Sequence, residues 1–491
     1  MTDSVIFDAR AMREVLASLP DVPAWESLTP PELSEVYLPK NHIKALNPEV
    51  SIVVGMRGSG KSFWTAVLSS EQPAHQHLRK VLFGHTWKSE VQVRVGYGLS
   101  EEESSFPSAR VLATLLKKQV DPFVIWQTVL LQHLLAVCAM DVPWKGGWSE
   151  STAWCAGHPE EVNRLLAQCD QLLQAQNKTL LVLFDALDRL GSEWPVIREL
   201  LRGALRLCLS CRSRRMIRLK FFLRPDMEED PEIWTFQDSS KLKASGVELQ
   251  WGKGDLYGLI FHGIGNSPES IGQTFRQQTS ITPWTCREGV YIVPDPLVRD
   301  EQRQKEIMAR IADTYMGSNS RRGYAYTWIP THLADAMGRV SPRSFLLAFK
   351  KAAEVTEERR ANHRLALHYE SIQQGVVQAS RTRVNEIKED YPWIKPILDA
   401  CRGLSVPSDS KEFTRYWDEQ SLQSVAEEGN TKLPPRRFTF DSVRLRRTDA
   451  LLDDLVELAV IYRTEDGRIN MPDIFRVEFG IKRKGGVKPP R

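Results

Sequence analysis

An apolar strand runs straight into a glycine-rich turn in the stretch Ser51-Ile-Val-Val-Gly55-Met-Arg57-Gly58-Ser59-Gly60-Lys61-Ser62, and this stretch indicates the fold class. Its second part fits G-x-x-x-x-G-K-[ST], the P-loop pattern. In this pattern, glycines let backbone N–H groups turn inward around a phosphate, the lysine reaches the β- and γ-phosphate oxygens, and the hydroxyl binds Mg²⁺. The predicted nucleotide-binding residues are Gly55, Arg57, Gly58, Ser59, Gly60, Lys61, Ser62 and Phe63.

The residues on both sides of this turn provide the context that the motif requires. Ser51–Val54 supplies a strand and Phe63–Leu68 begins a helix, whose positive N-terminal end adds to the anion site. A glycine turn in some other α/β unit is the alternative. A chance match to the motif in a chain of this length has a probability of roughly a few per cent.

A second informative stretch runs from Lys178 to Leu190, K-T-L-L-V-L-F-D-A-L-D-R-L. Its consecutive aliphatic residues predict a strand that is buried on both faces, as at the centre of a parallel sheet. Asp185 stands at the carboxyl end of this strand, where ligands bind in open α/β sheets, and is placed to hold Mg²⁺ through water. Asp188 lies further toward the γ-phosphate, and its alternative role is the N-cap of a helix.

A further strand, Met216–Leu223, ends on Arg224. A guanidinium fixed beside the metal-binding aspartate could contact the γ-phosphate and report its presence. The alternative is a salt bridge from Arg224 to Asp226 or Glu228.

The rest of the N-terminal half completes a predicted core of five strands with intervening helices. Val247–Trp251 is its last strand, and Lys80–Phe83 and the alternating Val91–Gly96 are further strand candidates. The other predicted elements are a lead-in helix over Ala9–Leu19, an acidic loop over Ser100–Ser108, helices over Arg110–Lys118, Val124–Ala139, Glu160–Gln176, Trp194–Cys208 and Asp255–His262, an irregular insertion over Trp144–Ser151, and a basic turn over Arg212–Arg215.

The composition bounds the class of protein. A chain of 491 residues suggests about three domains. A hydrophobic share of 42% with 26% charged residues is typical of soluble globular proteins, and a net charge of +3 does not by itself argue for a nucleic-acid partner. The seven cysteines are scattered, and Cys208 and Cys211 are interpreted as buried helix thiols. We expect a cytoplasmic protein with no signal peptide, spanning helix or membrane partner.

Together these residues resemble the STAND class of P-loop ATPases, signal-transduction switches related to AAA+ proteins. The resemblance rests on Gly55–Ser62, on Asp185-Ala-Leu-Asp188, which is like the Walker B motif of the class, and on Arg224, where the class carries an arginine after its sensor strand. Arg189 departs from the class, which often has an acid at that position. The departure leaves Asp188 as the candidate to activate water and predicts slow hydrolysis.

The resemblance also implies a helical lid followed by a winged helix. Gly338–Phe345 looks like the lid motif in which Pro342 opens a helix and Arg343 faces the phosphates, although the start of a helix alone also explains the proline. Thr448–Leu458 followed by the hairpin Val460–Met471 looks like a winged helix.

The predicted fold is therefore α/β: a P-loop NTPase core of AAA+/STAND-like type with a parallel sheet, a helical lid and a C-terminal winged-helix-like domain. The expected domains are an N-terminal helical lead-in (1–46), the core (47–265), the lid (266–368), with helices over Asp300–Tyr315 and Val340–Glu357, and a helical connector with the winged-helix-like domain (369–491).

The leading hypothesis is an ATP-dependent switch with ATP and Mg²⁺ as its cofactors. The catalytic and sensing roles are assigned to Lys61, Asp188, Arg224 and Arg343, and the metal to Ser62 and Asp185. The resemblance implies a homo-oligomer in which a neighbour's arginine completes the site, with Arg212, Arg214 and Arg215 as candidates. The output would belong to a separate effector protein, as in a bacterial antiphage defence system, by analogy with the class.

Two other functions stay open. A DNA-binding AAA+ ATPase of initiator or transposition-regulator type would grip duplex DNA through the winged helix, with the basic residues of Arg436–Arg447 and the basic tail Lys482–Arg491 on phosphates. Such units also dock proteins, and the tail, expected to be mobile, could be merely solubilising. A degenerate NTP-binding scaffold is the third function, suggested by Arg189.

Overall fold

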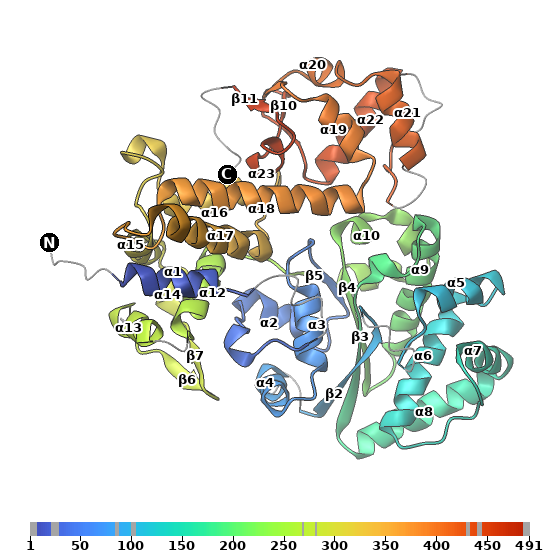
Figure 1. Cartoon of the computed structure of the whole chain (residues 1–491). Coiled ribbons are helices and arrows are strands. Elements are labelled where there is room, and N and C mark those ends of the chain that lie inside the picture. The colour runs from blue at the N-terminus through green and yellow to red at the C-terminus, as the bar shows by residue number, and fades with distance from the viewer. Residues whose placement is uncertain are drawn as a thin grey trace. The chain divides into compact units, whose positions relative to one another are not determined.

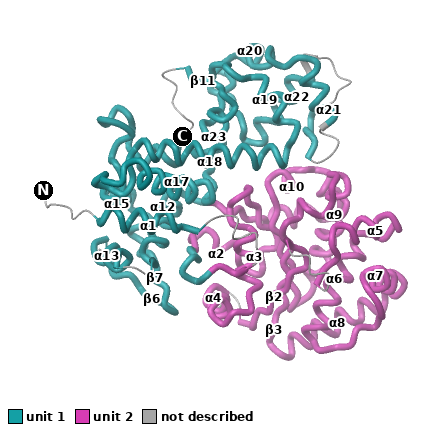
Figure 2. The backbone as a smooth tube through the Cα atoms, in the orientation of Figure 1, with its two compact units in different colours: residues 1–24, 32–37, 251–491 teal, residues 25–31, 38–250 magenta. Residues whose placement is uncertain are grey.

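The computed structural model describes the chain except for residues 1–6, 21–28, 84–87, 100–104, 268–269, 280–281, 429–432, 439–443 and 485–491, and except for the side chains of 428 and 444–446. The described chain divides into two compact units (Figure 2). Unit 2 comprises 25–31 and 38–250, and unit 1 comprises 1–24, 32–37 and 251–491. The four predicted domains divide the chain more finely and stay a prediction.

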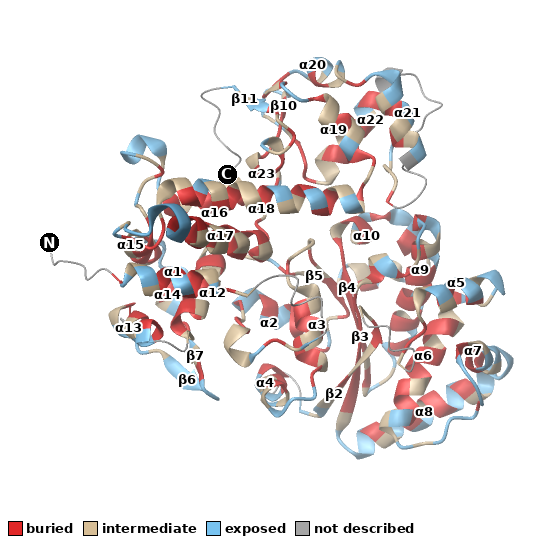
Figure 3. Cartoon of the chain, in the orientation of Figure 1, coloured by how far each residue is buried: buried red, intermediate tan, exposed pale blue. Residues whose placement is uncertain are grey.

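Unit 2 is built on a five-stranded, all-parallel sheet with the strand order β2-β3-β4-β1-β5 (Figure 1). The strands are β1 (Ile52–Val54), β2 (Glu90–Tyr97), β3 (Lys178–Phe184), β4 (Ile217–Leu223) and β5 (Val247–Glu248). The central strands β3 and β4 are almost wholly buried (Figure 3), as expected for a parallel sheet with both faces covered.

Helices cover both faces of this sheet. The helices α2 (Lys40–Leu46), α3 (Lys61–Ser69) and α4 (Pro73–Phe83) lie on one face, and α6 (Pro122–Val137), α8 (Pro159–Ala175) and α9 (Trp194–Cys211) lie on the other (Figure 1). The remaining elements of unit 2 are α5 (Ala109–Lys117), α7 (Trp148–Gly157), η3 (Leu187–Arg189), α10 (Pro225–Glu229), η4 (Pro231–Trp234) and α11 (Ser239–Lys243).

Two predictions for unit 2 are corrected. Lys80–Phe83 is not a strand but the end of α4, because burial at His75, Arg79 and Leu82 follows the helical spacing of three to four residues. The predicted insertion over Trp144–Ser151 is in part helical, since α7 begins at Trp148. Of the predicted acidic loop, residues 100–104 lie outside the described chain.

A buried lysine ties the sheet to the segment before the P-loop strand. Lys220, in the middle of β4, is fully buried and donates hydrogen bonds to the carbonyls of Ala45, Asn47 and Val50, at 2.8, 2.9 and 2.5 Å. These carbonyls belong to the end of α2 and the turn into β1. A buried ammonium needs such partners, so Lys220 fixes where the chain enters β1.

Unit 1 is mostly helical. Its helix α1 (Ala9–Ala17) is fastened to α17 (Pro342–Arg360) by the buried Arg13, which pairs with Glu357 at 2.6 Å, and α17 packs along α18 (Tyr369–Asp390). The elements before α17 are η2 (Leu33–Glu35), α12 (Lys253–Gly265), α13 (Ser270–Thr279), β6 (Thr285–Arg287), β7 (Val290–Ile292), α14 (Asp295–Arg299), α15 (Glu301–Ile311), η5 (Ser320–Arg322) and α16 (Ala325–Leu333).

The C-terminal part of unit 1 has the predicted winged-helix-like arrangement. The helix α22 (Arg444–Glu457) leads into an antiparallel hairpin of β9 (Tyr462–Arg463) and β10 (Ile469–Asn470), and a bridge from Ser408 to Ile469 adds a third segment to that sheet. The other elements there are α19 (Ile394–Ala400), β8 (Ser405–Val406), α20 (Ser410–Thr414), α21 (Glu419–Glu428), α23 (Asp473–Arg476) and β11 (Lys482–Arg483). The predicted fold class is confirmed.

One prediction for the tail is wrong in part. Its first residues are not mobile but form β11, which pairs in parallel with β8, and Lys484 N–H donates to the carbonyl of Val406 at 2.8 Å. Residues 485–491 lie outside the described chain. Among the helices that the structure describes, none has the length and apolarity that a membrane span requires.

Candidate functional site

The P-loop has the backbone that its glycines were predicted to supply. Gly58 and Gly60 have φ angles of 79° and 104°. These angles lie in the left-handed region, which residues other than glycine rarely adopt. A Cβ at Gly55 would lie 2.3 Å from the hydroxyl oxygen of Ser59. The loop opens with Gly55 N–H donating to the carbonyl of Leu223 at 2.9 Å, which joins it to the end of β4.

Lys61 begins α3 and folds back over the loop. Its ammonium donates to the carbonyls of Gly55 and Met56, at 2.6 and 3.0 Å. Burial lowers the pKa of Lys61 to about 8, and the charges of Asp185 and Asp188 act against that shift. The ammonium is thus held inside the loop by weak neutral acceptors, which a phosphate oxygen can replace with a stronger, charged one.

The predicted metal ligands lie together at the end of β3. Asp185 is buried; burial raises the pKa of its carboxyl, and a hydrogen bond from Ser62 acts in the opposite direction. A cavity of about 330 Å³ adjoins both residues. A carboxylate and a hydroxyl beside an open space are the oxygen ligands that Mg²⁺ prefers while it keeps several waters. These residues fit the predicted ion.

Arg224 lies between two acids. Its Nε donates to Asp226 at 3.1 Å, and a terminal nitrogen donates to Asp188 at 3.4 Å. Arg224 and Asp226 are buried, whereas the side chain of Asp188 is 35% exposed. The salt bridge to Asp226 that was the alternative for Arg224 is therefore formed, together with one to the predicted catalytic acid.

The alternative for Asp188, a helix N-cap, is wrong. Asp188 lies inside the short helix η3, and the residue that precedes the next helix, α9, is Glu193. The chain reaches η3 through Ala186, whose φ of 54° is uncommon for a residue with a side chain. Such strain persists only where the surroundings hold it.

Tyr97, which the sequence motifs did not reveal, holds both ends of this turn. The Tyr97 carbonyl at the end of β2 accepts from Asp185 N–H at 3.0 Å, and its buried hydroxyl donates to the carbonyl of Arg189 at 2.9 Å. Trp126 packs edge-on against the ring, with centroids 5.9 Å apart. Tyr97 ends the strand that pairs with β3, and this signal becomes visible only once the register of the two strands is known.

The segment before the P-loop strand packs on the P-loop helix. The indole of Trp64 in α3 donates to Nδ1 of His42 at 3.1 Å, and burial lowers the pKa of His42 to about 4. Phe63, predicted as a nucleotide contact, is buried with its ring 5.4 Å from that of Trp64, and Arg57 is half-buried. Nucleotide contacts by Arg57 and Phe63 stay predictions.

The other predicted arginines belong to other elements. Arg343 follows Pro342 at the start of α17, in unit 1, and pairs with Glu386 at 2.7 Å. Arg212, Arg214 and Arg215 form the turn before β4, at the opposite end of the parallel sheet from the P-loop. Their roles toward a nucleotide, in this chain or in a neighbour, stay predictions.

No family model and no curated protein matches the chain. Among solved structures it is similar to ORC1 of Aeropyrum pernix in complex with DNA, with 15% identity, a TM-score of 0.33, and coverage of 94% of this chain and 93% of that one. It is also similar to ORC2 of the same organism in its ADPNP–ADP complexes, with 12% identity, a TM-score of 0.39 and 97% of each chain covered. At these TM-scores the similarity carries no argument about function.

The position of Tyr97 predicts an effect on ATP turnover without one on ATP binding. Tyr97→Phe removes one hydrogen bond, of about 1 kcal/mol, and should lower kcat about three- to tenfold while KM for ATP stays within about twofold. Tyr257→Phe is the matched control, because Tyr257 in unit 1 also donates from a buried hydroxyl to a backbone carbonyl. Equal losses in both variants, or a rise in KM alone, would contradict the role.

The pKa of Lys61 predicts that MgATP affinity falls as the pH rises. Burial among its present neighbours sets this pKa at about 8, and the negative charge of a phosphate beside the ammonium raises it, so binding takes up a proton above pH 8. Affinity measured by calorimetry should therefore drop about tenfold from pH 7 to pH 9.

Lys61→Arg is the control, because a guanidinium stays protonated over this range. Its remaining affinity should not change with pH. Lys220, whose pKa burial lowers to about 7, is present in both proteins. If MgATP affinity fell equally with pH in the unchanged protein and in Lys61→Arg, another group would be titrating, and the prediction for Lys61 would be wrong.

Proposed function

We propose that the chain is an AAA+-type ATPase that binds ATP with Mg²⁺ and hydrolyses it slowly, using the two nucleotide states as a switch. One observation carries this: the P-loop, Arg224 and Asp185 follow three neighbouring parallel strands, β1, β4 and β3, at their carboxyl ends. Ligands of open α/β sheets bind at that edge.

Each residue has a role that its contacts support. The loop amides and Lys61 would hold the phosphates, and Ser62 with Asp185 would hold Mg²⁺. Bound Mg²⁺ would neutralise developing charge on the phosphate oxygens. Asp188 would orient and deprotonate the attacking water, since it is the partly exposed acid next to the buried Arg224.

The same contacts support slow turnover. The guanidinium of Arg224 lies 3.4 Å from Asp188, so this ion pair competes with a water molecule for the Asp188 carboxylate. Arg189, which is exposed, stands where the related class often has an acid. Slow hydrolysis would prolong the ATP-bound state, and a switch needs such a long-lived state.

Two variants test this proposal. Lys61→Ala should weaken ATP binding at least about a hundredfold, because the loop loses its charge, and Asp188→Asn should keep affinity within about threefold while lowering kcat about a hundredfold. Asp226→Asn is the matched control, an equal change in the other acid that Arg224 contacts, and should keep measurable turnover.

Full ATP affinity in Lys61→Ala would contradict the site. Negligible turnover in the unchanged protein, equal to that of Asp188→Asn, would favour the degenerate scaffold instead. The STAND assignment, a separate effector, homo-oligomer formation and an antiphage role stay predictions from the resemblance.

We also propose that the nucleotide state controls binding of duplex DNA by the winged-helix-like part of unit 1. The observation that favours it is α22 followed by the β9–β10 hairpin, with Arg444-Leu-Arg-Arg447 in the first turn of the helix. Recognition helices of such motifs contact DNA through their N-terminal residues. Arg447 itself is buried and pairs with Glu419 at 3.3 Å, and Arg436 pairs with Glu457, so we expect weak, strongly salt-dependent binding.

The double variant Arg444→Glu with Arg446→Glu tests this output. Duplex affinity should fall at least about tenfold, and the slope of log affinity against log salt should drop by about two. Arg110→Glu with Lys117→Glu on the exposed face of α5 makes the same change in net charge and should leave affinity unaltered. Absence of duplex binding, or equal losses in both double variants, would contradict the proposal.

A further inference from the structure

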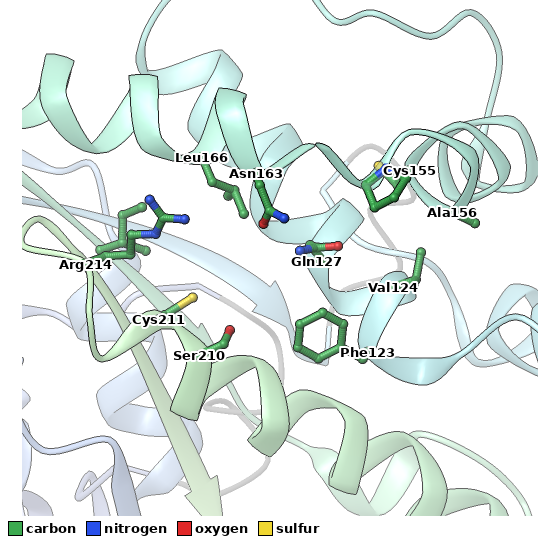
Figure 4. Close-up of a pocket in the computed structure, with 12 residues that line it drawn as sticks. Phe123, Val124, Gln127, Cys155, Ala156, Asn163, Leu166, Ser210, Cys211 and Arg214 are labelled. Atoms are coloured by element: carbon green, nitrogen blue, oxygen red, sulfur yellow. The ribbon is translucent and has the colours of Figure 1, made fainter. Parts of the chain in front are cut away.

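A second cavity lies in unit 2, at the opposite end of the sheet from the P-loop. It has a volume of about 460 Å³ and is lined by α6, α7, α8, the end of α9 and the first residue of β4 (Figure 4). Ile217, which begins β4, lines this cavity, whereas Arg224 follows the other end of the strand. Its volume is in the range of small-molecule sites.

The walls are mainly apolar. Phe123, Leu166 and Ile217 line the cavity together with the thiols of Cys155 and Cys211. Burial raises the pKa of Cys155, and it raises that of Cys211 to about 12. Both thiols are therefore protonated at neutral pH, so they act as apolar wall and not as nucleophiles or metal ligands.

Four polar side chains line the same cavity, and one of them, Ser210, already donates its hydroxyl to the carbonyl of Leu207 at 2.8 Å. The other three come from three different segments. They are Gln127 of α6, Asn163 of α8 and Arg214 of the turn before β4, and the amide groups of Gln127 and Asn163 point toward each other (Figure 4). Within the described part of the chain, none of the three end groups has a hydrogen bond or ion pair to another side chain or to the backbone. Polar groups in a pocket that lack protein partners are available to a ligand.

The charge of the cavity is positive. Arg214 carries the charge of the lining, and no acid is among the described lining residues. The guanidinium acts on the thiol of Cys211, which places it at that wall. Asp170, the nearby acid, accepts from the backbone N–H groups of Arg215 and Met216 at 3.1 and 2.8 Å, so its carboxylate already has partners.

From this arrangement we infer a second ligand site, for a small organic carboxylate with an apolar body. The carboxylate binds the guanidinium of Arg214, which presents a planar pair of donors. The apolar body packs between Phe123 and Leu166, and the amides of Gln127 and Asn163 bind a polar group on the ligand. The site is independent of the nucleotide site, and its occupancy does not require the proposed function.

The test uses 4-phenylbutyrate and its neutral counterpart 4-phenylbutyramide as probes on the full chain, with binding followed by calorimetry and ligand-observed NMR. The carboxylate should bind saturably and at least about tenfold more tightly than the amide, because only it pairs with Arg214. Arg214→Gln should abolish that difference. Arg215→Gln, an exposed neighbour absent from the lining, should keep it.

Leu166→Trp provides a second variant, because it fills the cavity without changing its charge. It should abolish binding of both probes while ATP binding at the P-loop stays unchanged, which separates this site from the proposed nucleotide site. Lack of saturable binding, equal affinity for the two probes, an equal effect of Arg215→Gln, or displacement of the carboxylate by MgATP would each overturn the inference.

Discussion

The parallel pairing of β4 between β1 and β3 is the constraint on which the site depends. Because the three strands run in the same direction, the P-loop, Arg224 and Asp185 emerge side by side at one edge of the sheet. The hydrogen bond from Gly55 N–H to the carbonyl of Leu223 continues that pairing into the loop. Lys220 secures the other end of β1 by binding the carbonyls that precede it. The P-loop, Asp185 and Arg224 are thus positioned mainly by backbone pairing.

Charged side chains at this edge of the sheet then determine how it can interact with a nucleotide. Lys61 and Arg224 bring two positive charges into a partly buried site, and Asp185, Asp188 and Asp226 bring three negative ones. Arg224 bridges Asp188 and Asp226, so the contacts that the Asp188 carboxylate can make depend on where the guanidinium points. A γ-phosphate is a competing anionic partner for the same guanidinium. Arrival or loss of that phosphate would therefore change the state of Asp188, which links nucleotide identity to chemistry at one residue.

The P-loop, the strand β3 and the acid at its end could be predicted from the sequence, because short local patterns determine them. Glycines at positive φ, the long apolar run of β3 and the acid at its end all leave direct signals near Gly60 and Asp185. Lys80–Phe83 was assigned wrongly, since four residues cannot distinguish a buried strand from the end of an amphipathic helix. Tyr97 was missed for another reason: its role comes from the register of β2 on β3, which no short motif records. The pocket at Arg214 likewise depends on packing between distant helices.

The most direct measurement is an experimental structure with Mg²⁺ and a non-hydrolysable ATP analogue. We expect the Lys61 ammonium to leave the carbonyls of Gly55 and Met56, to which it donates here, and to bind the β- and γ-phosphate oxygens. Mg²⁺ should lie beside Ser62 and Asp185. A nucleotide bound away from the P-loop, or Lys61 still bonded to the two carbonyls with a nucleotide present, would show that this edge of the sheet is not the nucleotide site.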